Sequence, residues 1–274
     1  MSKDALEDFG ERLSCHVRDG AIWSSTLPLI PDRQTRDALR WRAAAAVAGG
    51  QVPASIVISE SVDSAISAIL WAVGQELLRL SFITEHGETL YLPEDGDSEM
   101  NGFYGCVPGW RTWYSKERVD DRYDLAHIPA EYGVEDDSDD PAPNLDDLEM
   151  PRRAIEELGI LFVRHVRDVA IQSCDMQLLP HSQTAVAKRW RRAAIPFHGQ
   201  VPPQVLIPDC VDEAIYAFLR AIDQGLLRLS YVSENGETVD LVKEGRGELA
   251  ARYMAADGWR AKYSKERINE DVAE

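Results

Sequence analysis

Apolar residues near the start of the chain are spaced three or four positions apart, at Leu6, Phe9, Leu13, Val17 and Ala21. This spacing gathers them on one face of an α-helix and predicts a long first helix. A second helix is predicted around residues 40–42 and a third over 59–75. In the second half of the chain, the helix corresponding to 59–75 is predicted to begin at Pro208, because proline is favoured in a first helical turn. Asp63 and Asp212 would then be first-turn charges.

After residue 75 the apolar period changes from about 3.6 to two. Leu78, Leu80 and Phe82 alternate with polar positions, which is typical of a strand with one buried face. The dipeptide Asn235-Gly236, directly before the β-like run 238–241, is a strong hairpin signal. The pattern therefore predicts an antiparallel hairpin after the third helix.

The chain contains the same pattern twice. Residue i matches residue i+149 from position 6 to 118 without insertion or deletion, with 53 identities over these 113 pairs. A period this long exceeds that of solenoid repeats, so each copy is expected to fold around its own core. The fold class predicted is α+β: two homologous, mainly helical domains at 1–120 and 153–274, each with three to four helices and a small antiparallel β-hairpin. We call residues 6–118 the first repeat and 155–267 the second repeat.

Acidic residues are concentrated between the repeats. Residues 119–154 hold 12 acids and 3 bases, a net charge of −9, which is half of the −18 of the whole chain. The run Glu135–Asp140 and the nearby prolines are typical of an extended connector. Residues 121–152 are therefore interpreted as an acidic linker. An alternative is an acidic arm that docks on a basic partner.

Composition gives an ordinary globular protein, with 45% hydrophobic and 28% charged residues. Residues 1–12 lack the apolar run of a secretory signal, and no stretch was expected to reach the length of a membrane span, so a cytoplasmic protein without membrane contact is predicted. The four cysteines fall at four different repeat positions. A fold common to both repeats therefore does not depend on a disulfide.

Several short blocks recur in both repeats: HVRD, RWR, LLRLS and GWR followed by YSKER. Together they resemble an uncharacterised bacterial domain family of unknown function, present here as two tandem copies. The resemblance implies the repeat boundaries and no activity.

Common catalytic motifs are missing from the sequence, including GxxxxGK[ST], GxGxxG, GxSxG, HExxH and CxxC. No cofactor and no metal site are predicted. If the protein is an enzyme, the candidate residues are His16, Asp19 and Glu99 with their counterparts His165, Asp168 and Glu248. A structural histidine is the simpler interpretation of His16.

Arg18 and Asp19 lie away from the apolar stripe, yet are identical in both repeats. One interpretation is an ion-pair network within each domain, with Glu99, Glu117 or Arg118 as partners. The other is a polar pocket formed by Arg18, Asp19, Glu99 and Arg111.

A second group of shared residues combines aromatic rings with arginines. Such residues are common both in cores and at interface hot spots. The candidate binding residues from the two groups are Arg18, Asp19, Trp41, Glu99, Trp110, Arg111, Tyr114, Arg167, Asp168, Trp190, Glu248, Trp259, Arg260 and Tyr263. Direct nucleic-acid binding is disfavoured, because both repeats are net negative.

Three tryptophans of the first repeat, Trp23, Trp71 and Trp113, have polar counterparts in the second. If they are exposed, they predict an apolar patch that forms either the contact between the domains or a partner site on the first repeat. The favoured function is a non-enzymatic protein-binding or regulatory protein, such as an immunity or antitoxin-type inhibitor of a basic protein partner. The alternatives are an enzyme with an unrecognised polar site in each repeat and a structural module in which the repeats pack as an intramolecular pseudo-dimer.

Overall fold

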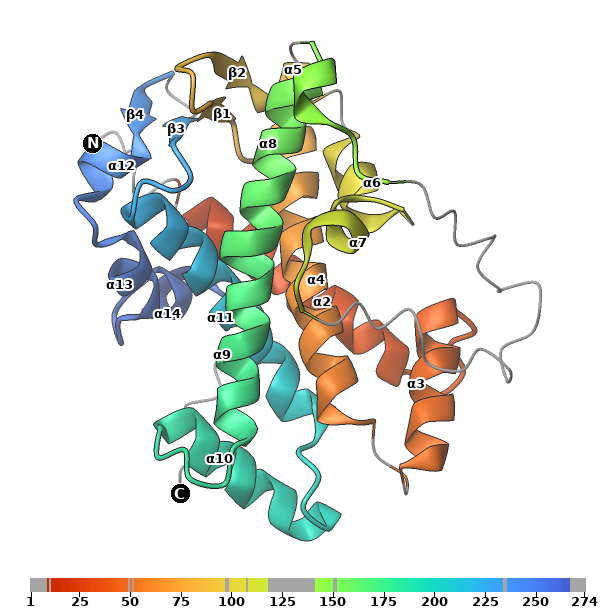
Figure 1. Cartoon of the computed structure of the whole chain (residues 1–274). Helices are drawn as coiled ribbons and strands as arrows, with labels where there is room; N and C mark the ends of the chain where they lie inside the picture. The colour runs from red at the N-terminus through yellow and green to blue at the C-terminus, as the bar shows by residue number, and fades with distance from the viewer. Residues whose placement is uncertain are drawn as a thin grey trace.

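The computed structural model describes residues 9, 11–48, 50, 52–96, 99–106, 108–117, 141–149, 152–233 and 236–266. Helices make up most of the protein, and one small antiparallel sheet lies at one end of it, which confirms the α+β class (Figure 1). The acidic run 135–140 and the turn residues 234–235 lie outside the described residues.

The first repeat contains η1 (Leu13–Arg18), α2 (Asp19–Thr26), η2 (Leu27–Leu29), α3 (Arg36–Val47), α4 (Ala54–Gly74), β1 (Leu80–Ile83), β2 (Thr89–Tyr91), α5 (Leu92–Asp95), α6 (Met100–Gly105) and α7 (Trp110–Tyr114). A short 3₁₀ turn, η5 (Leu145–Asp147), precedes the second repeat. That repeat contains α8 (Arg152–Phe162), η6 (Val163–Arg167), α9 (Asp168–Leu178), α10 (Ala185–Ala194), η7 (Ile195–Phe197), α11 (Pro203–Asp223), β3 (Leu229–Val232), β4 (Thr238–Asp240), α12 (Leu241–Gly245), α13 (Leu249–Met254) and α14 (Trp259–Tyr263). The predicted helices and hairpins are present, and the last part of each repeat adds three short helices.

One sheet joins the two repeats. The strand order is β2-β1-β3-β4, so the central pair β1 and β3 brings together one strand from each repeat. These strands are antiparallel, with Leu80 opposite Tyr231, Ser81 opposite Ser230 and Phe82 opposite Leu229. Ser230 is the repeat counterpart of Ser81. The register therefore has the two-fold symmetry of an isologous contact between equivalent segments.

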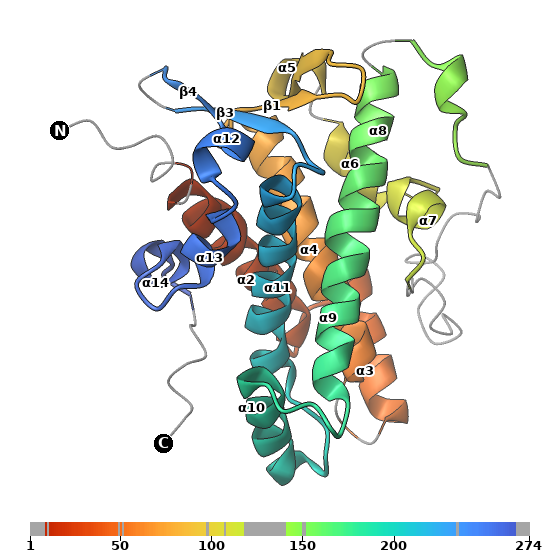
Figure 2. The same ribbon diagram turned by 60° about the vertical axis from the view of Figure 1, so that its left-hand side comes forward.

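The long helices α4 and α11 pack against each other beneath this sheet (Figure 2). Buried apolar residues of both repeats form one cluster, so the expectation that each repeat folds around its own core does not hold. The reason is the width of the apolar surface on these helices. Ile56, Val57 and Ile58 of α4 are consecutive, so they point to three different sides of the helix, yet all three are fully buried. Helices α11 and α9 of the second repeat contact α4 and cover part of this surface.

Helix α4 corrects the expectation that no stretch of the chain reaches the length of a membrane span. By length and apolar composition alone, this helix could cross a membrane. Its most apolar window is 67% buried inside the protein, which is the behaviour of a core helix. Packing against α11 and α2 explains its apolar character.

Candidate functional site

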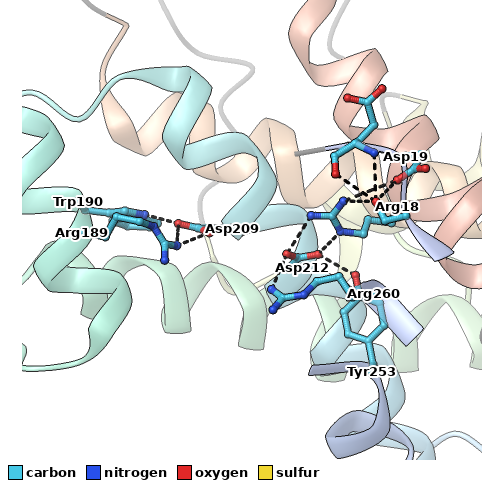
Figure 3. A network of polar contacts seen from close by, with 10 residues as sticks. Arg18, Asp19, Arg189, Trp190, Asp209, Asp212, Tyr253 and Arg260 are labelled. Atoms are coloured by element: carbon cyan, nitrogen blue, oxygen red, sulfur yellow. Dashed lines mark hydrogen bonds and ion pairs between the residues drawn. The ribbon is translucent and has the colours of Figure 1, made fainter. Parts of the chain in front are cut away.

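Arg18, at the end of the π-helical turn η1, is completely buried and contacts the second repeat. Its Nε donates to Oδ1 of Asp212 at 2.6 Å, and its Nη2 donates to Oδ2 at 3.2 Å (Figure 3). The same carboxylate accepts hydrogen bonds from the Tyr253 hydroxyl at 2.7 Å and from Arg260 at 3.0 Å. Asp212 on α11 is therefore the centre of a buried network that joins the repeats.

A second network, centred on Asp63, has the same contacts with the roles of the two repeats exchanged. Arg167 of the second repeat donates its Nε to Asp63 of the first at 2.6 Å. Tyr104 donates its hydroxyl to Asp63, and Arg111 donates to it at 3.1 Å. Each repeat thus supplies an arginine to the other repeat's aspartate, and the two networks are related by the same pseudo-symmetry as the sheet.

A serine extends each network to the second shared acid. In one network Arg18 donates to the hydroxyl of Ser264 at 2.6 Å, and that hydroxyl donates to Asp19. In the other, the hydroxyl of Ser115 donates to Asp168 at 2.6 Å. Asp19 and Asp168 therefore bind the last segment of the opposite repeat.

Electrostatics within these networks favour a charged aspartate, a charged arginine and a neutral tyrosine. Burial alone would raise the pKa of Asp63, but the guanidinium groups of Arg167 and Arg111 lower the pKa below its ordinary value. Burial would likewise lower the pKa of Arg18, and Asp212 raises it instead. Burial and the Asp63 carboxylate together keep the pKa of the Tyr104 hydroxyl well above its ordinary value. An arginine-bound carboxylate with a lowered pKa is a weak base, so these networks serve structure better than proton transfer.

The structure corrects both sequence interpretations of Arg18 and Asp19. Arg18 and Asp19 lie 3.6 Å apart, but Arg18 also donates to Asp212 and Asp19 accepts from Lys265, both in the other repeat. The network is therefore not internal to one domain. The pocket of Arg18, Asp19, Glu99 and Arg111 does not form, because Arg18 and Arg111 contact different aspartates and Glu99 is exposed. Glu248, the counterpart of Glu99, is also exposed and pairs with Arg252 at 3.5 Å.

Sequence reasoning missed the central acids. Asp63 and Asp212 were placed in first helical turns, but α4 begins at Ala54 and α11 at Pro203, so both acids lie inside their helices. Pro203 takes the first-turn position that was assigned to Pro208. The signal that could have found these acids was their identity in both repeats.

The shared aromatic residues are core residues. Trp41, Trp110, Trp190 and Trp259 are at most 3% exposed, which removes them from any partner surface. The equivalent tyrosines Tyr114 and Tyr263 have different contacts. The Tyr114 hydroxyl donates to Glu156 at 2.9 Å, whereas Tyr263 is partly buried and the Lys262 ammonium lies over its ring.

A cavity of about 350 Å³ lies beside the Asp63 network. It is walled by α2, η2, α3 and α4, with the end of α6 and the start of α7. Trp41 donates its indole N–H to Glu60, which also pairs with Arg40. The lining residues are Ser24, Ser25, Pro28, Arg40, Trp41, Glu60, Asp63, Ser64, Ser67, Gly105 and Arg111. We call this the first cavity.

The second repeat has a cavity of about 280 Å³ at the equivalent place, here called the second cavity. Arg189 and Trp190 both donate to Asp209, at 2.5 and 2.6 Å, as their counterparts do to Glu60 (Figure 3). The remaining lining has changed: Cys174, Glu213 and Met254 stand where the first cavity has Ser25, Ser64 and Gly105. The two cavities share a frame and differ in chemistry.

Glu213 provides a pH test of the second cavity. Burial raises the pKa of its carboxyl above the ordinary value of about 4.5, and a hydrogen bond from Ser173 offsets only part of that effect. A carboxyl with a raised folded-state pKa costs stability once pH rises through the unfolded value. Glu213→Gln is therefore expected to raise the free energy of unfolding near neutral pH, with the gain shrinking as pH falls below about 4.5.

Urea unfolding of both proteins across this pH range measures the difference. Glu248→Gln, at an exposed acid, controls for the substitution itself. A variant that is less stable at neutral pH would show that the charge of Glu213 stabilises the fold.

The shared histidines do not build a metal centre in the described part of the chain, where no group of three or more His, Cys, Asp and Glu is arranged to hold a metal ion. His16 is exposed, and partial burial together with the nearby Arg12 lowers its pKa. It therefore lies apart from both networks and both cavities.

No protein-family model matches the chain, and comparisons with curated proteins and with solved structures give no significant match.

Proposed function

We propose that this is a non-enzymatic protein-binding or regulatory protein, acting in the cytoplasm as two homologous domains fused into an intramolecular pseudo-dimer. The observation that carries the proposal is the division between shared and diverged residues. Shared polar residues such as Arg18 and Asp63 are used in contacts between the repeats. The exposed tryptophans of the first repeat, by contrast, stand where the repeats differ: Trp23 is 61% exposed and Trp71 is 49% exposed.

Trp23 and Trp71 lie on the neighbouring helices α2 and α4. Tryptophan is strongly enriched among interface hot spots. Trp113 does not join them, because it packs against the core and against the Tyr114 ring. The proposed partner surface therefore contains Trp23 of α2 and Trp71 of α4.

Charge supports a basic protein as the partner. The net charge of −18 creates a field that steers a cationic surface toward the protein. An immunity or antitoxin-type inhibitor of a basic protein fits this combination of acidity and an aromatic face. Raising the salt concentration would then slow association.

The test uses the intact protein to capture partners from its native host. Trp23→Gln/Trp71→Arg installs the second repeat's own residues, Gln172 and Arg220, at these two positions. A stoichiometric partner of the wild type should be lost, with its dissociation constant raised about 30-fold or more when measured by calorimetry with purified proteins, since a tryptophan hot spot contributes about 2 kcal/mol or more.

Met176→Gln is the matched control, because Met176 is an exposed apolar residue (55%) of the second repeat and should not affect binding. Retention of the partner by the double tryptophan variant would reject this surface.

Catalysis in the cavities is the second candidate function. One observation favours it: burial raises the pKa of the Asp209 carboxyl, as in many general acids. We rank it second because Arg189 and Trp190 already hold that carboxylate in internal contacts.

A further inference from the structure

The first cavity carries no uncompensated charge among its lining residues. Its two acids are paired within its own wall, Glu60 with Arg40 and Asp63 with Arg111. A charged ligand would have to lose its hydration without gaining a new counter-charge, which is unfavourable. The balance of charges therefore favours an uncharged ligand.

Hydroxyl groups dominate the rest of the wall. Ser24, Ser25, Ser64 and Ser67 come from α2 and α4, on two sides of the cavity. Ser25 is only 6% exposed, and its Oγ has no hydrogen-bond partner among the described residues. A buried hydroxyl without a partner is destabilising, so an apolar occupant would leave Ser25 unsatisfied.

The second cavity keeps the arginine, tryptophan and acid of the first cavity but differs in several other lining residues. Cys174 replaces Ser25, Glu213 replaces Ser64 and Met254 replaces Gly105, which removes hydroxyls and adds an acid. The frame of Arg, Trp and acid is kept in both places. The serine lining at these positions is thus a property of the first cavity and not of the second.

We propose that the first cavity binds a small, uncharged, polyhydroxylated molecule of the monosaccharide or cyclitol type. Such a ligand presents alternating donors and acceptors to the serines and to the paired acids and arginines, and it brings no charge. The volume of about 350 Å³ lies at the lower end of the range for small-molecule sites, which suits a ligand of a single ring. The proposal does not depend on the partner surface at Trp23 and Trp71.

Binding is tested on the intact protein by ligand-observed NMR and calorimetry. The probes are glucose and myo-inositol as neutral ligands, with glucose 6-phosphate and glucosamine as charged relatives of similar shape. At least one neutral probe is expected to bind with a dissociation constant of about 1 mM or tighter. It should bind at least about 10-fold more tightly than the charged probes.

Two variants locate the site. Ser25→Ala removes the buried hydroxyl, and Ser64→Glu gives the first cavity the acid found in the second; each should weaken binding at least about 10-fold. The reverse change, Glu213→Ser, alters the second cavity and should leave the affinity unchanged. Thermal unfolding of each variant verifies that it is folded.

Three outcomes would overturn the proposal: none of the neutral probes binds, a charged probe binds best, or a neutral probe binds equally well to Ser25→Ala and Ser64→Glu. Capture of a protein partner is measured separately, so the two proposals can fail independently.

Discussion

Replacing Asp212 by alanine is expected to lower the free energy of unfolding by about 3–5 kcal/mol, because it leaves buried guanidinium groups without their carboxylate. Arg18 is fully buried and Arg260 is 8% exposed, and both donate to this side chain. The Tyr253 hydroxyl loses its acceptor at the same time. Urea-induced unfolding at neutral pH, followed by circular dichroism, measures the change.

The chain offers two matched comparisons for this result. Asp63→Ala removes the centre of the equivalent network and should cost a similar amount. Glu248→Ala breaks an exposed pair with Arg252 and should cost at most about 1 kcal/mol. If Asp212→Ala were no more destabilising than Glu248→Ala, the network would not hold the repeats together.

Local patterns predicted the secondary structure well, for a physical reason. The helices and hairpins are determined by apolar spacing and turn residues within a few positions, as in α4 and in the pair β3–β4. The start of α11 was misplaced by five residues, from Pro208 to Pro203, because either proline is a reasonable first-turn residue.

Contacts between the repeats could not be predicted in this way. Arg18 and Asp212 are 194 residues apart in sequence, and nothing local indicates whether an arginine binds its own repeat or the other. The identity of both residues in the two repeats showed that they are constrained. It could not show that the constraint is reciprocal exchange between the repeats.

The cavities illustrate the same limit. Trp41 and Glu60 are 19 residues apart, and they meet only because α3 folds back on α4. Of the cavity residues, the sequence pattern predicts Trp41, Arg111, Trp190 and Arg260 as binding residues. It places only Arg111 in a pocket, and there with Arg18, Asp19 and Glu99, which line neither cavity. Serines such as Ser25 gave no signal, because an isolated serine on a helix is ordinary.

Cutting the chain within the acidic segment 121–140 is expected to leave its two parts bound to each other. The central strands β1 and β3, the helices α4 and α11, and the two arginine–aspartate networks all join one repeat to the other. An interface that resembles a divided core is typical of obligate complexes. After cleavage at an inserted protease site, the fragments should co-elute at the full mass in size-exclusion chromatography at about 1 μM, which requires an affinity of about −8 kcal/mol or better.

The uncut protein and the cut protein in denaturant are the reference states for this experiment. Cleaved protein carrying Asp63→Ala and Asp212→Ala is the variant that should dissociate first, because both networks are then broken. Separate elution of two folded fragments from the wild type would mean that each repeat is an independent domain and that the shared sheet contributes little to stability. Co-elution would mean that the repeats assemble as a dimer does, with segment 121–140 dispensable for holding them together.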